Sequence, residues 1–238
     1  MTPLVTVVIP VLFDADAVAR VLSQIPASAD LEVVIVDGAQ DPRLDDIAAA
    51  HGRARVQRTP AGRGRQMNAG AEGASGEWLF FLHADSVLPE AWTSAFGTLE
   101  ATVVGGWFRF ALDDAAWQAR VIEQLVAWRV RFLRLPYGDQ GLFVRRRQFR
   151  ALGGFAEWPL LEDVAFARRL VRGGPVAELP LALKTSSRRW QRDGWFRRST
   201  MNLAIVALYF VGVSPARLAR WYHRRAPNGE SRTMRSEN

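Results

Sequence analysis

Apolar and polar positions alternate in blocks along the first half of the chain, and the blocks have the lengths of strands and helices. Four short runs rich in β-branched or aromatic residues predict buried strands, at residues 5–9, 31–36, 54–57 and 78–82. Three segments with apolar residues every three or four positions predict helices, at residues 14–25, 42–51 and 65–74. Strands that alternate with helices predict an α/β fold with a mostly parallel, doubly wound sheet that has helices on both faces.

The second half of the chain has a less regular pattern. Aromatic and polar residues alternate at 105–112, which predicts a half-exposed strand. Further helices are expected at 114–135 and 161–171, and further strands at 141–144 and 176–179. The pattern contains no linker and no internal repeat. We therefore expect an α/β domain at 1–190, a helical extension at 191–225 and a disordered tail at 226–238.

The extension contains a nearly uninterrupted apolar run, from Met201 to Val213. The run is shorter than the roughly 20 residues that span a bilayer, so we do not expect it to cross a membrane. The arginines and aromatic residues that flank it are typical of a helix on an anionic membrane surface. Packing on the sheet and a homodimer interface are the alternatives. Ser214-Pro215 predicts the start of another helix, and the helix expected at 114–135 has a similar apolar face that can join either arrangement.

Composition adds a strong basic excess. Among 238 residues, 31 are basic and 24 acidic, the net charge is +7, and Lys184 is the only lysine. Arginine forks match phosphate oxygens, so the excess fits a diphosphate, a nucleic acid or a lipid surface, or it reflects a GC-rich coding bias. The chain has no cysteine, which excludes disulfides and thiolate metal sites. The chain enters a strand at once, with no basic region ahead of an apolar stretch. We expect a cytoplasmic protein, either free or peripheral at the inner face of the cell membrane.

Two acidic residues, Asp37 and Asp85, stand where predicted strands end. The carboxyl edge of a parallel sheet is where such folds bind ligands. Because Mg²⁺ and Mn²⁺ prefer carboxylate and phosphate oxygens, Asp85 predicts a metal site that a substrate diphosphate completes. His83 contacts a ribose, ligates a softer ion such as Mn²⁺, or caps the strand. Asp37 accepts hydrogen bonds from a nucleobase or ribose, or forms an Asx turn.

An acidic pair, Glu162-Asp163, opens the helix expected at 161–171. The helix dipole alone favours acids at this position. A carboxylate there also suits a base that accepts the proton of an acceptor hydroxyl. Asp163 is the predicted base, and Glu162 orients it or binds the acceptor.

A glycine-rich segment at 62–70 carries Arg63 and Arg65 directly ahead of a predicted helix. Arginines at a helix amino terminus form an anion site. The alternative is a solvated basic loop. The spacing of the glycines is not that of a dinucleotide-binding fingerprint.

Two later segments combine polar residues with glycine or tryptophan. The turn at 137–141, with Asp139 and Gln140, predicts part of a sugar or acceptor pocket, or a plain turn. Arg189 and Trp190 predict a guanidinium that holds a diphosphate and an indole that stacks on a sugar ring. A surface arginine–aromatic cluster is the alternative for that pair.

Taken in order, these motifs resemble those of glycosyltransferase family two, which has the Rossmann-like GT-A fold. The resemblance extends over about residues 4 to 190, and it rests on the strand at 6–10, Asp37, His83-Ala84-Asp85 and Glu162-Asp163. More narrowly, residues 64–70, 81–85 and 137–141 are similar to a small bacterial branch. Members of that branch are associated with radical-SAM and selenium or arsenic gene clusters.

The resemblance implies a metal-dependent, inverting glycosyltransferase that uses a nucleoside-diphosphate sugar of the UDP or GDP type. The acceptor is an unknown small molecule or lipid, and no nucleic-acid partner is expected. Asp163 is the base of a single displacement, and Mg²⁺ or Mn²⁺ neutralises the departing diphosphate. The implied donor-binding residues are Pro10, Asp37, Arg63, Arg65, Asn68, His83, Ala84 and Arg189. The implied sugar or acceptor residues are Gly106, Asp139, Gln140 and Trp190, and the implied metal ligands are Asp85 and His83.

The chain departs from the family pattern at three places. The usual Asn-Glu after the first strand is missing, and Phe13-Asp14 stands near that place. His83 stands in place of the first acid of the usual Asp-x-Asp motif, and Ser186 replaces the glutamine of the Gln-x-x-Arg-Trp motif of processive members. We therefore do not expect polymer synthesis. Two other classes stay open. One is a nucleotidyltransferase, disfavoured because no glycine-rich phosphate loop follows the first strand. The other is a noncatalytic relative that binds anions or membranes.

Overall fold

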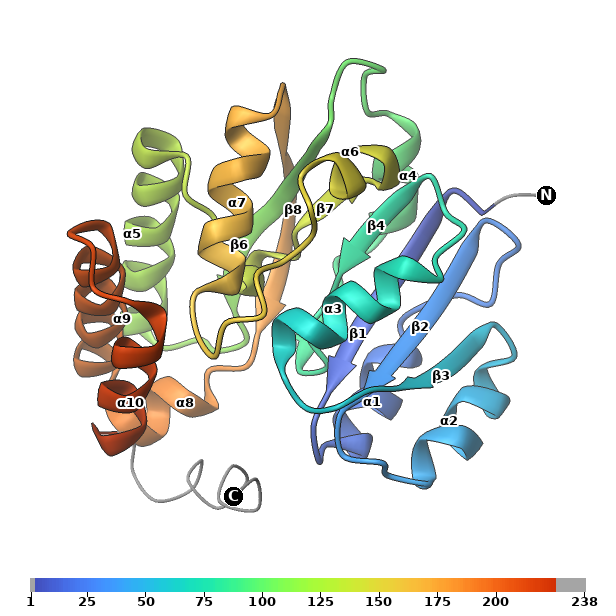
Figure 1. Cartoon of the computed structure of the whole chain (residues 1–238), viewed down its shortest axis with the longest axis horizontal. Coiled ribbons are helices and arrows are strands. Elements are labelled where there is room, and N and C mark those ends of the chain that lie inside the picture. Colours follow the sequence, from blue (N-terminus) through green and yellow to red (C-terminus); the bar gives the residue numbers. More distant parts are fainter. Residues whose placement is uncertain (1–2, 226–238) are drawn as a thin grey trace.

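The computed structural model describes residues 3–225, and within them the chain forms one eight-stranded sheet with helices on both faces (Figure 1). The strands are β1 Val5–Val11, β2 Leu31–Asp37, β3 Ala54–Arg58, β4 Trp78–Phe81, β5 Ser86–Val87, β6 Gly105–Leu112, β7 Phe143–Arg145 and β8 Val176–Thr185. The helices before the sheet's last long strand are α1 Ala15–Leu22, α2 Arg43–His51, α3 Arg63–Glu72, α4 Trp92–Gly97, α5 Trp117–Leu133, the 3₁₀ turn η1 Gly138–Gln140, α6 Arg146–Ala151 and α7 Glu162–Arg172. Three more follow it, α8 Arg188–Asp193, α9 Trp195–Phe210 and α10 Pro215–Arg225.

The strand order is β3-β2-β1-β4-β7-β6-β8-β5. β3, β2, β1 and β4 are mutually parallel, β7 runs antiparallel between β4 and β6, and β8 is parallel to β6. The sheet is therefore mostly parallel, as predicted. The chain leaves β1 toward β2 on one side and returns to β4 on the other. Diverging connections of this kind open a crevice at the carboxyl ends of the two central strands.

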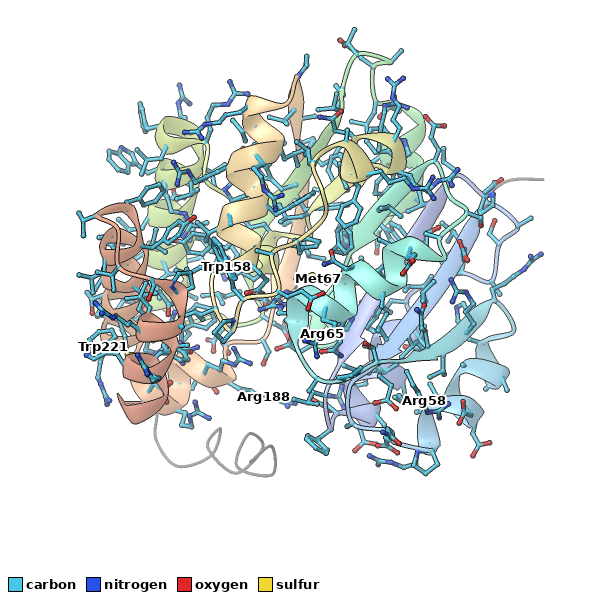
Figure 2. All side chains as sticks on the ribbon, viewed as in Figure 1. Arg58, Arg65, Met67, Trp158, Arg188 and Trp221 are labelled. Carbon is cyan, nitrogen blue, oxygen red and sulfur yellow. The ribbon has the colours of Figure 1, made fainter. Side chains whose placement is uncertain are left out.

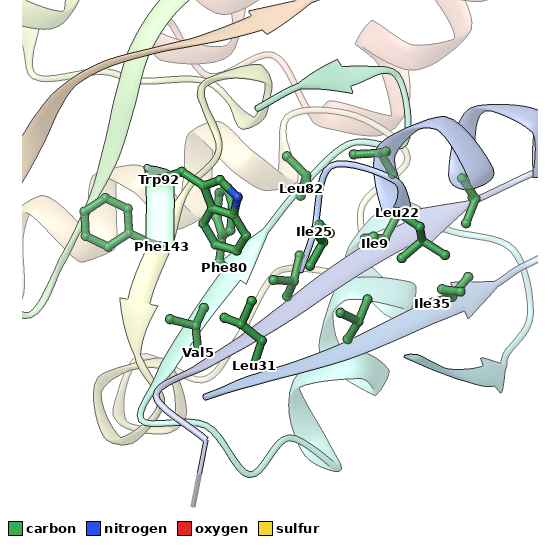
Figure 3. Packing of buried hydrophobic residues seen from close by; sticks show 14 of the residues in the cluster. Val5, Ile9, Leu22, Ile25, Leu31, Ile35, Phe80, Leu82, Trp92 and Phe143 are labelled. Atoms are coloured by element: carbon green, nitrogen blue, oxygen red, sulfur yellow. The ribbon is translucent and has the colours of Figure 1, made fainter. Parts of the chain in front are cut away.

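Burial of apolar residues on both faces of the sheet holds the layers together. On one face α1, α2 and α4 pack on side chains such as Ile9, Ile35 and Phe80 (Figure 3). On the other face α3, α6 and α7 pack on a cluster that contains Val8 and Phe81. Each large apolar side chain that is fully buried contributes about 1.5–3 kcal/mol. Alternate residues of β1 and β4 therefore face opposite helical layers, which explains why these strands read as continuous apolar runs.

The prediction that residues 105–112 form a half-exposed strand is wrong. Of β6 only Arg109 is exposed, and the neighbouring Trp107 and Phe108 are both buried, one toward each helical layer. β6 lies inside the sheet between β7 and β8, and helices pack on both of its faces, so its side chains join buried clusters on both sides. β8 is also longer than predicted, because it continues beside β6 past an irregularity in register at Phe108/Arg109.

The carboxyl-terminal helices pack on the domain through part of the predicted apolar run. Ile205 and Val206 of α9 join a buried cluster with Leu161 and Val164 near the start of α7 and with Leu218 of α10. The new helix begins at Pro215, as predicted. The tail predicted to be disordered, 226–238, lies outside the described residues. In the described part of the chain, no helix is long and apolar enough to cross a membrane.

Candidate active site

A pocket of about 680 Å³ opens at the carboxyl ends of β1 and β4. Its amino-terminal wall comes from β1, the start of α3 and the residues after β4. Its carboxyl-terminal wall comes from η1, the segment before α7, the start of α7, and α8 and α9. Arg65 of the first wall and Trp158 of the second are labelled in Figure 2.

Most of the site residues predicted from the sequence line this pocket. They are Pro10, Arg63, Arg65, His83, Ala84, Asp85, Asp139, Asp163, Arg189 and Trp190. The sheet edge brings the first six together, because each follows or ends a central strand or begins the helix that crosses beside it. Asp139, Asp163, Arg189 and Trp190 come from separate later elements that converge on the same opening.

The start of α3 ties the amino-terminal wall to the opposite one. Gly62 has φ +138°, a conformation that side chains rarely adopt, and it directly precedes Arg63. Gly64 packs closely on the segment before α7, which belongs to the carboxyl-terminal wall. An added Cβ at Gly64 would lie 2.3 Å from the carbonyl oxygen of Ala156. The glycines of this segment therefore serve close packing as well as the turn, which places the arginine side chains at the pocket.

Arg63 determines the tautomer and the charge of the His83 imidazole. The Arg63 Nη2 lies 3.0 Å from His83 Nδ1, and a guanidinium only donates hydrogen bonds, so Nδ1 accepts and the ring proton sits on Nε2. Burial, followed by the charges of Arg63 and Arg189, lowers the pKa of His83 well below its ordinary value. His83 is therefore a neutral donor through Nε2–H in this arrangement. The predicted metal ligation by His83 does not fit this geometry, because Nε2 has no free lone pair.

Asp163 occupies the first turn of α7, where backbone amides orient its carboxylate. Oδ2 accepts a 2.7 Å hydrogen bond from the Gly138 N–H, and Oδ1 accepts one of 2.7 Å from the Val164 N–H. Each oxygen keeps a further lone pair. The carboxylate is thus held in place on the pocket wall with capacity to accept a proton.

Glu162 lies behind the pocket and is not among its lining residues. Its side chain is buried, and its Oε1 lies 3.6 Å from Arg63 Nε. Burial raises the pKa of Glu162 to about 7, and the charge of Asp163 adds to that rise. This carboxyl holds Arg63 in place, and it does not touch the space that an acceptor would occupy.

Asp139 brings a half-buried carboxyl to the carboxyl-terminal wall. Burial raises the pKa of Asp139 to about 6; the nearby Arg129 opposes the rise and Asp163 reinforces it. Its buried Oδ1 has no hydrogen-bond partner within the described residues. A buried polar atom without a partner is costly, so this oxygen is available to a substrate group.

Two predicted donor-binding residues lie outside the pocket lining. Asp37 is fully buried; its Oδ1 accepts a 2.8 Å hydrogen bond from the Ala39 N–H in an Asx turn, and its Oδ2 has no hydrogen-bond partner within the described residues. Asn68 uses both ends of its amide on the backbone of Phe155, at 2.9 and 2.8 Å. Neither residue lines the pocket. Asn68 instead fastens α3 to the segment before α7.

Two predicted sugar or acceptor residues also lie away from the pocket lining. Gly106 is inside the sheet, where an added Cβ would lie 1.9 Å from the carbonyl oxygen of Ala177. Gln140 is buried; its Oε1 accepts a 3.1 Å hydrogen bond from Arg129 Nη2, and its Nε2 donates to the Phe108 carbonyl at 3.4 Å. Both positions serve close packing and backbone hydrogen bonding, so we assign them no substrate contact.

Sequence reasoning missed several residues of the carboxyl-terminal wall. Trp158, Arg198 and Asn202 line the pocket. Asn202 is the one polar side chain in the apolar stretch 201–213, and that isolation was a usable signal. Trp158 precedes a proline in an irregular segment, and nothing in the sequence shows where such a segment folds back.

The pocket fits a divalent ion through one protein carboxylate. Among the described residues, no group of three or more acidic, histidine or cysteine side chains is placed to hold a metal. Mg²⁺ binds through one or two carboxylates when substrate phosphates and water complete its shell. Asp85 is exposed on the pocket wall in the turn between β4 and β5, so it can supply that carboxylate.

The sheet and its helices define a GT-A type α/β fold, the class of the nucleotide-sugar glycosyltransferases. The family model for glycosyl transferase family 2 matches residues 6–151, more than half of the chain, and the protein belongs to this family of glycosyltransferases. The match covers β1 to α6, which includes His83 and Asp85. It ends before Asp163. No curated protein sequence matches the chain significantly.

Solved structures share the fold at low sequence identity. The S. aureus protein TarS, residues 1–349 in complex with UDP-GlcNAc, superposes with a TM-score of 0.61 at 14% identity, covering 90% of this chain and 69% of that one. Another structure of TarS 1–349 gives 0.56 at 15% identity, covering 90% and 68%. A mycobacterial protein gives 0.52 at 18% identity, covering 77% and 65%. Identities this low support the fold and not a shared substrate.

Proposed function

We propose that the protein transfers a sugar from a nucleoside-diphosphate sugar to an acceptor hydroxyl, with inversion at the anomeric carbon. One observation carries the proposal: a single pocket brings Asp85 and arginines at the sheet edge to face Asp163 at the start of α7. The pocket volume of about 680 Å³ lies within the range of about 300–1,000 Å³ typical of ligand sites.

The amino-terminal wall suits the donor diphosphate. Arg63, Arg65 and, from the other wall, Arg189 offer guanidinium groups to phosphate oxygens, and His83 offers a neutral Nε2–H. Asp85 would hold the Mg²⁺ or Mn²⁺ ion, which when bound supplies Lewis-acid neutralisation of the leaving group. Fixed positive groups at this position stabilise the charge that develops as the diphosphate departs.

The carboxyl-terminal wall suits the acceptor. Asp163 accepts the proton of the attacking hydroxyl while the acceptor oxygen bonds to the anomeric carbon and the bond to the diphosphate breaks. The electron pair of that bond leaves with the nucleoside diphosphate. One carboxylate is enough for a single displacement. Asp139 and Trp190 line the same pocket, and we assign them to contact with the sugar or acceptor.

A UDP-type donor is the first candidate, because the neighbour TarS was solved with UDP-GlcNAc; a GDP-type donor is the second. The sequence resemblance to a small bacterial branch associated with radical-SAM and selenium or arsenic gene clusters remains a prediction.

The proposal is tested with a thermal-shift screen of UDP, GDP, CDP and ADP, each with and without Mn²⁺. A ligand that binds the native state raises the melting temperature by mass action. We expect one base to give a shift that depends on Mn²⁺, and the matching nucleotide sugar to release nucleoside diphosphate when acceptor is present. Release of pyrophosphate from the matching nucleoside triphosphate and a sugar phosphate would instead make the protein a nucleotidyltransferase. No shift with any nucleotide would favour the noncatalytic anion-binding alternative.

A further inference from the structure

Two exposed apolar stripes lie on α5 and α9. On α5 the stripe is Trp117, Val121, Leu125, Trp128 and Phe132, whose exposed fractions are between 37% and 64%. On α9 it is Phe196, Leu203 and Phe210, exposed by 46–61%. The rings of Trp117 and Phe196 are 6.0 Å apart, so the stripes meet. We call these eight residues the α5/α9 apolar face.

The regular spacing of both stripes shows that the exposed residues form one face of each helix. Steps of four, four, three and four residues along α5, and of seven along α9, follow the helical repeat. α5 also has a separate buried side, with Ala119, Ile122 and Val130. α5 is therefore apolar toward the protein and apolar toward solvent. A contiguous exposed patch of this kind marks an interaction surface.

The charges around the face are almost all positive. Residues 194–225, which contain α9 and α10, include no aspartate or glutamate. Arg131, Arg134 and Arg197 are exposed beside the stripes. The one acid of α5, Glu123, is mostly covered and forms a 2.8 Å ion pair with Arg120. Tryptophan and phenylalanine within a rim of arginines match the apolar boundary and anionic headgroups of a bilayer.

A second copy of the chain fits this face less well. A twofold interface places the same patch on both subunits, so the arginine rims would face each other. Neither α9 nor α10 offers a carboxylate to pair with them. Like charges across an interface oppose association.

The same helix links the face to the pocket. Arg198 and Asn202 of α9 line the pocket. Trp158, also a lining residue, has its ring 6.1 Å from Tyr209, and Tyr209 has its ring 5.6 Å from Phe210 of the face. Aromatic side chains thus lead from the carboxyl-terminal wall of the pocket to the exposed stripe.

We propose that the α5/α9 apolar face seats the protein on an anionic bilayer, and that the acceptor is an amphiphile held in that bilayer. The first part stands on the face alone. The second part rests on the proposed function, because it assigns the substrate that enters past Trp158. On the membrane, the carboxyl-terminal wall of the pocket would lie close to the headgroups.

Flotation with vesicles tests the first part without any sugar donor. We expect the full chain to float with vesicles of phosphatidylglycerol and phosphatidylcholine and to stay in solution with phosphatidylcholine alone. Trp117→Ser/Trp128→Ser should abolish flotation. Arg131→Gln/Arg134→Gln should weaken the partition into anionic vesicles by at least about tenfold. The matched control Arg147→Gln/Arg150→Gln removes two exposed arginines of α6 and should leave flotation unchanged.

Three results would overturn the docking proposal. The native chain does not float, or the α6 control loses as much flotation as Arg131→Gln/Arg134→Gln, or the chain forms a lipid-free dimer that Trp117→Ser/Trp128→Ser dissociates. Melting temperature, read for every variant, shows that the fold is retained. The acceptor is tested with the nucleotide sugar that the nucleotide screen identifies, labelled with a radioactive sugar. When the protein and this donor are mixed with vesicles made from bacterial lipid extract, the label should enter the lipid phase. Donor binding with label only in water-soluble products would overturn the amphiphile assignment alone, whereas absence of donor binding would overturn the proposed function.

Discussion

The two walls of the pocket are built in different ways. The amino-terminal wall uses the ends of β1 and β4 and the start of α3, and its arginines are held by other side chains: Arg63 by His83 and Glu162, and Arg65 by Glu157. The carboxyl-terminal wall uses η1, α7, α8 and α9, and its key carboxylate is held by backbone amides. The amino-terminal wall presents Arg63 and Arg65 beside Asp85, and the carboxyl-terminal wall presents Asp139 and Asp163 beside Arg189. Under the proposed function, most of the donor contacts therefore lie on one part of the chain and the base lies on another.

Asp163→Asn is the substitution for which we expect the largest effect, a loss of turnover without a loss of donor binding. The amide cannot accept the acceptor's proton, and general base catalysis contributes about 10²–10⁴-fold, so turnover should fall by about that factor. Binding of the nucleoside diphosphate should stay within about twofold, because the cations of the other wall are untouched. Steady-state rates and calorimetric titration measure the two quantities. Asp46→Asn, an exposed change on α2, is the control; an equal loss of binding and turnover would remove Asp163 as the base.

Glu162→Gln tests how much the ionised Glu162 carboxylate lowers the free energy of unfolding. The folded pKa of about 7 lies above the ordinary 4.5, so the folded state binds the proton more tightly. This contribution to stability is complete below about pH 4.5 and is lost as pH rises through 7. The variant should therefore be more stable than the native protein at pH 8, by up to about 3 kcal/mol, and nearly equal to it at pH 4.5. Urea unfolding at both values measures the difference, and a stability gap that does not change with pH contradicts it.

Asp85→Ala should act on the other wall. If Asp85 holds the divalent ion, nucleoside-diphosphate affinity with Mn²⁺ should fall by about tenfold or more, because one charged ligand is lost. Affinity without the ion should change little. Titration calorimetry with and without Mn²⁺ separates these results. Equal affinity of the native protein in both conditions would exclude the assigned ligand role.

The amino-terminal wall was far more predictable from the sequence than the carboxyl-terminal one. β1, β2 and β4 are buried on both faces, so their apolar runs are unmistakable, and an acid directly after such a strand must lie at the sheet edge. Asp163 was predictable for a similar reason, since it opens a strongly amphipathic helix. The nearness of the two acids follows from the sheet order and not from local pattern.

Long-range packing explains the predictions that failed. The family resemblance assigns Asn68 to donor binding, yet its amide bonds to Phe155, 87 positions away. The same resemblance assigns Gly106 to the sugar or acceptor pocket, yet β8 packs against it inside the sheet. β6 alternates like a surface strand because its polar Arg109 reaches solvent while helices and neighbouring strands cover the rest. No local pattern contains the partner in these cases.

Arg65 and Glu157 offer the finest test, because their ion pair joins the two walls. Arg65 Nε and Glu157 Oε2 are 3.1 Å apart, with both side chains about half exposed, so the pair should contribute no more than about 1 kcal/mol to stability. Under the proposed function, the Glu157 carboxylate would compete with a donor phosphate for the Arg65 guanidinium. Glu157→Gln should therefore strengthen nucleoside-diphosphate binding by about threefold, whereas Arg65→Gln should weaken it by a similar factor. Titration of both single variants and the double variant at low and high salt measures the coupling. If Glu157→Gln weakens binding, then Glu157 positions Arg65 for the donor, and the walls cooperate in donor binding instead of dividing the work.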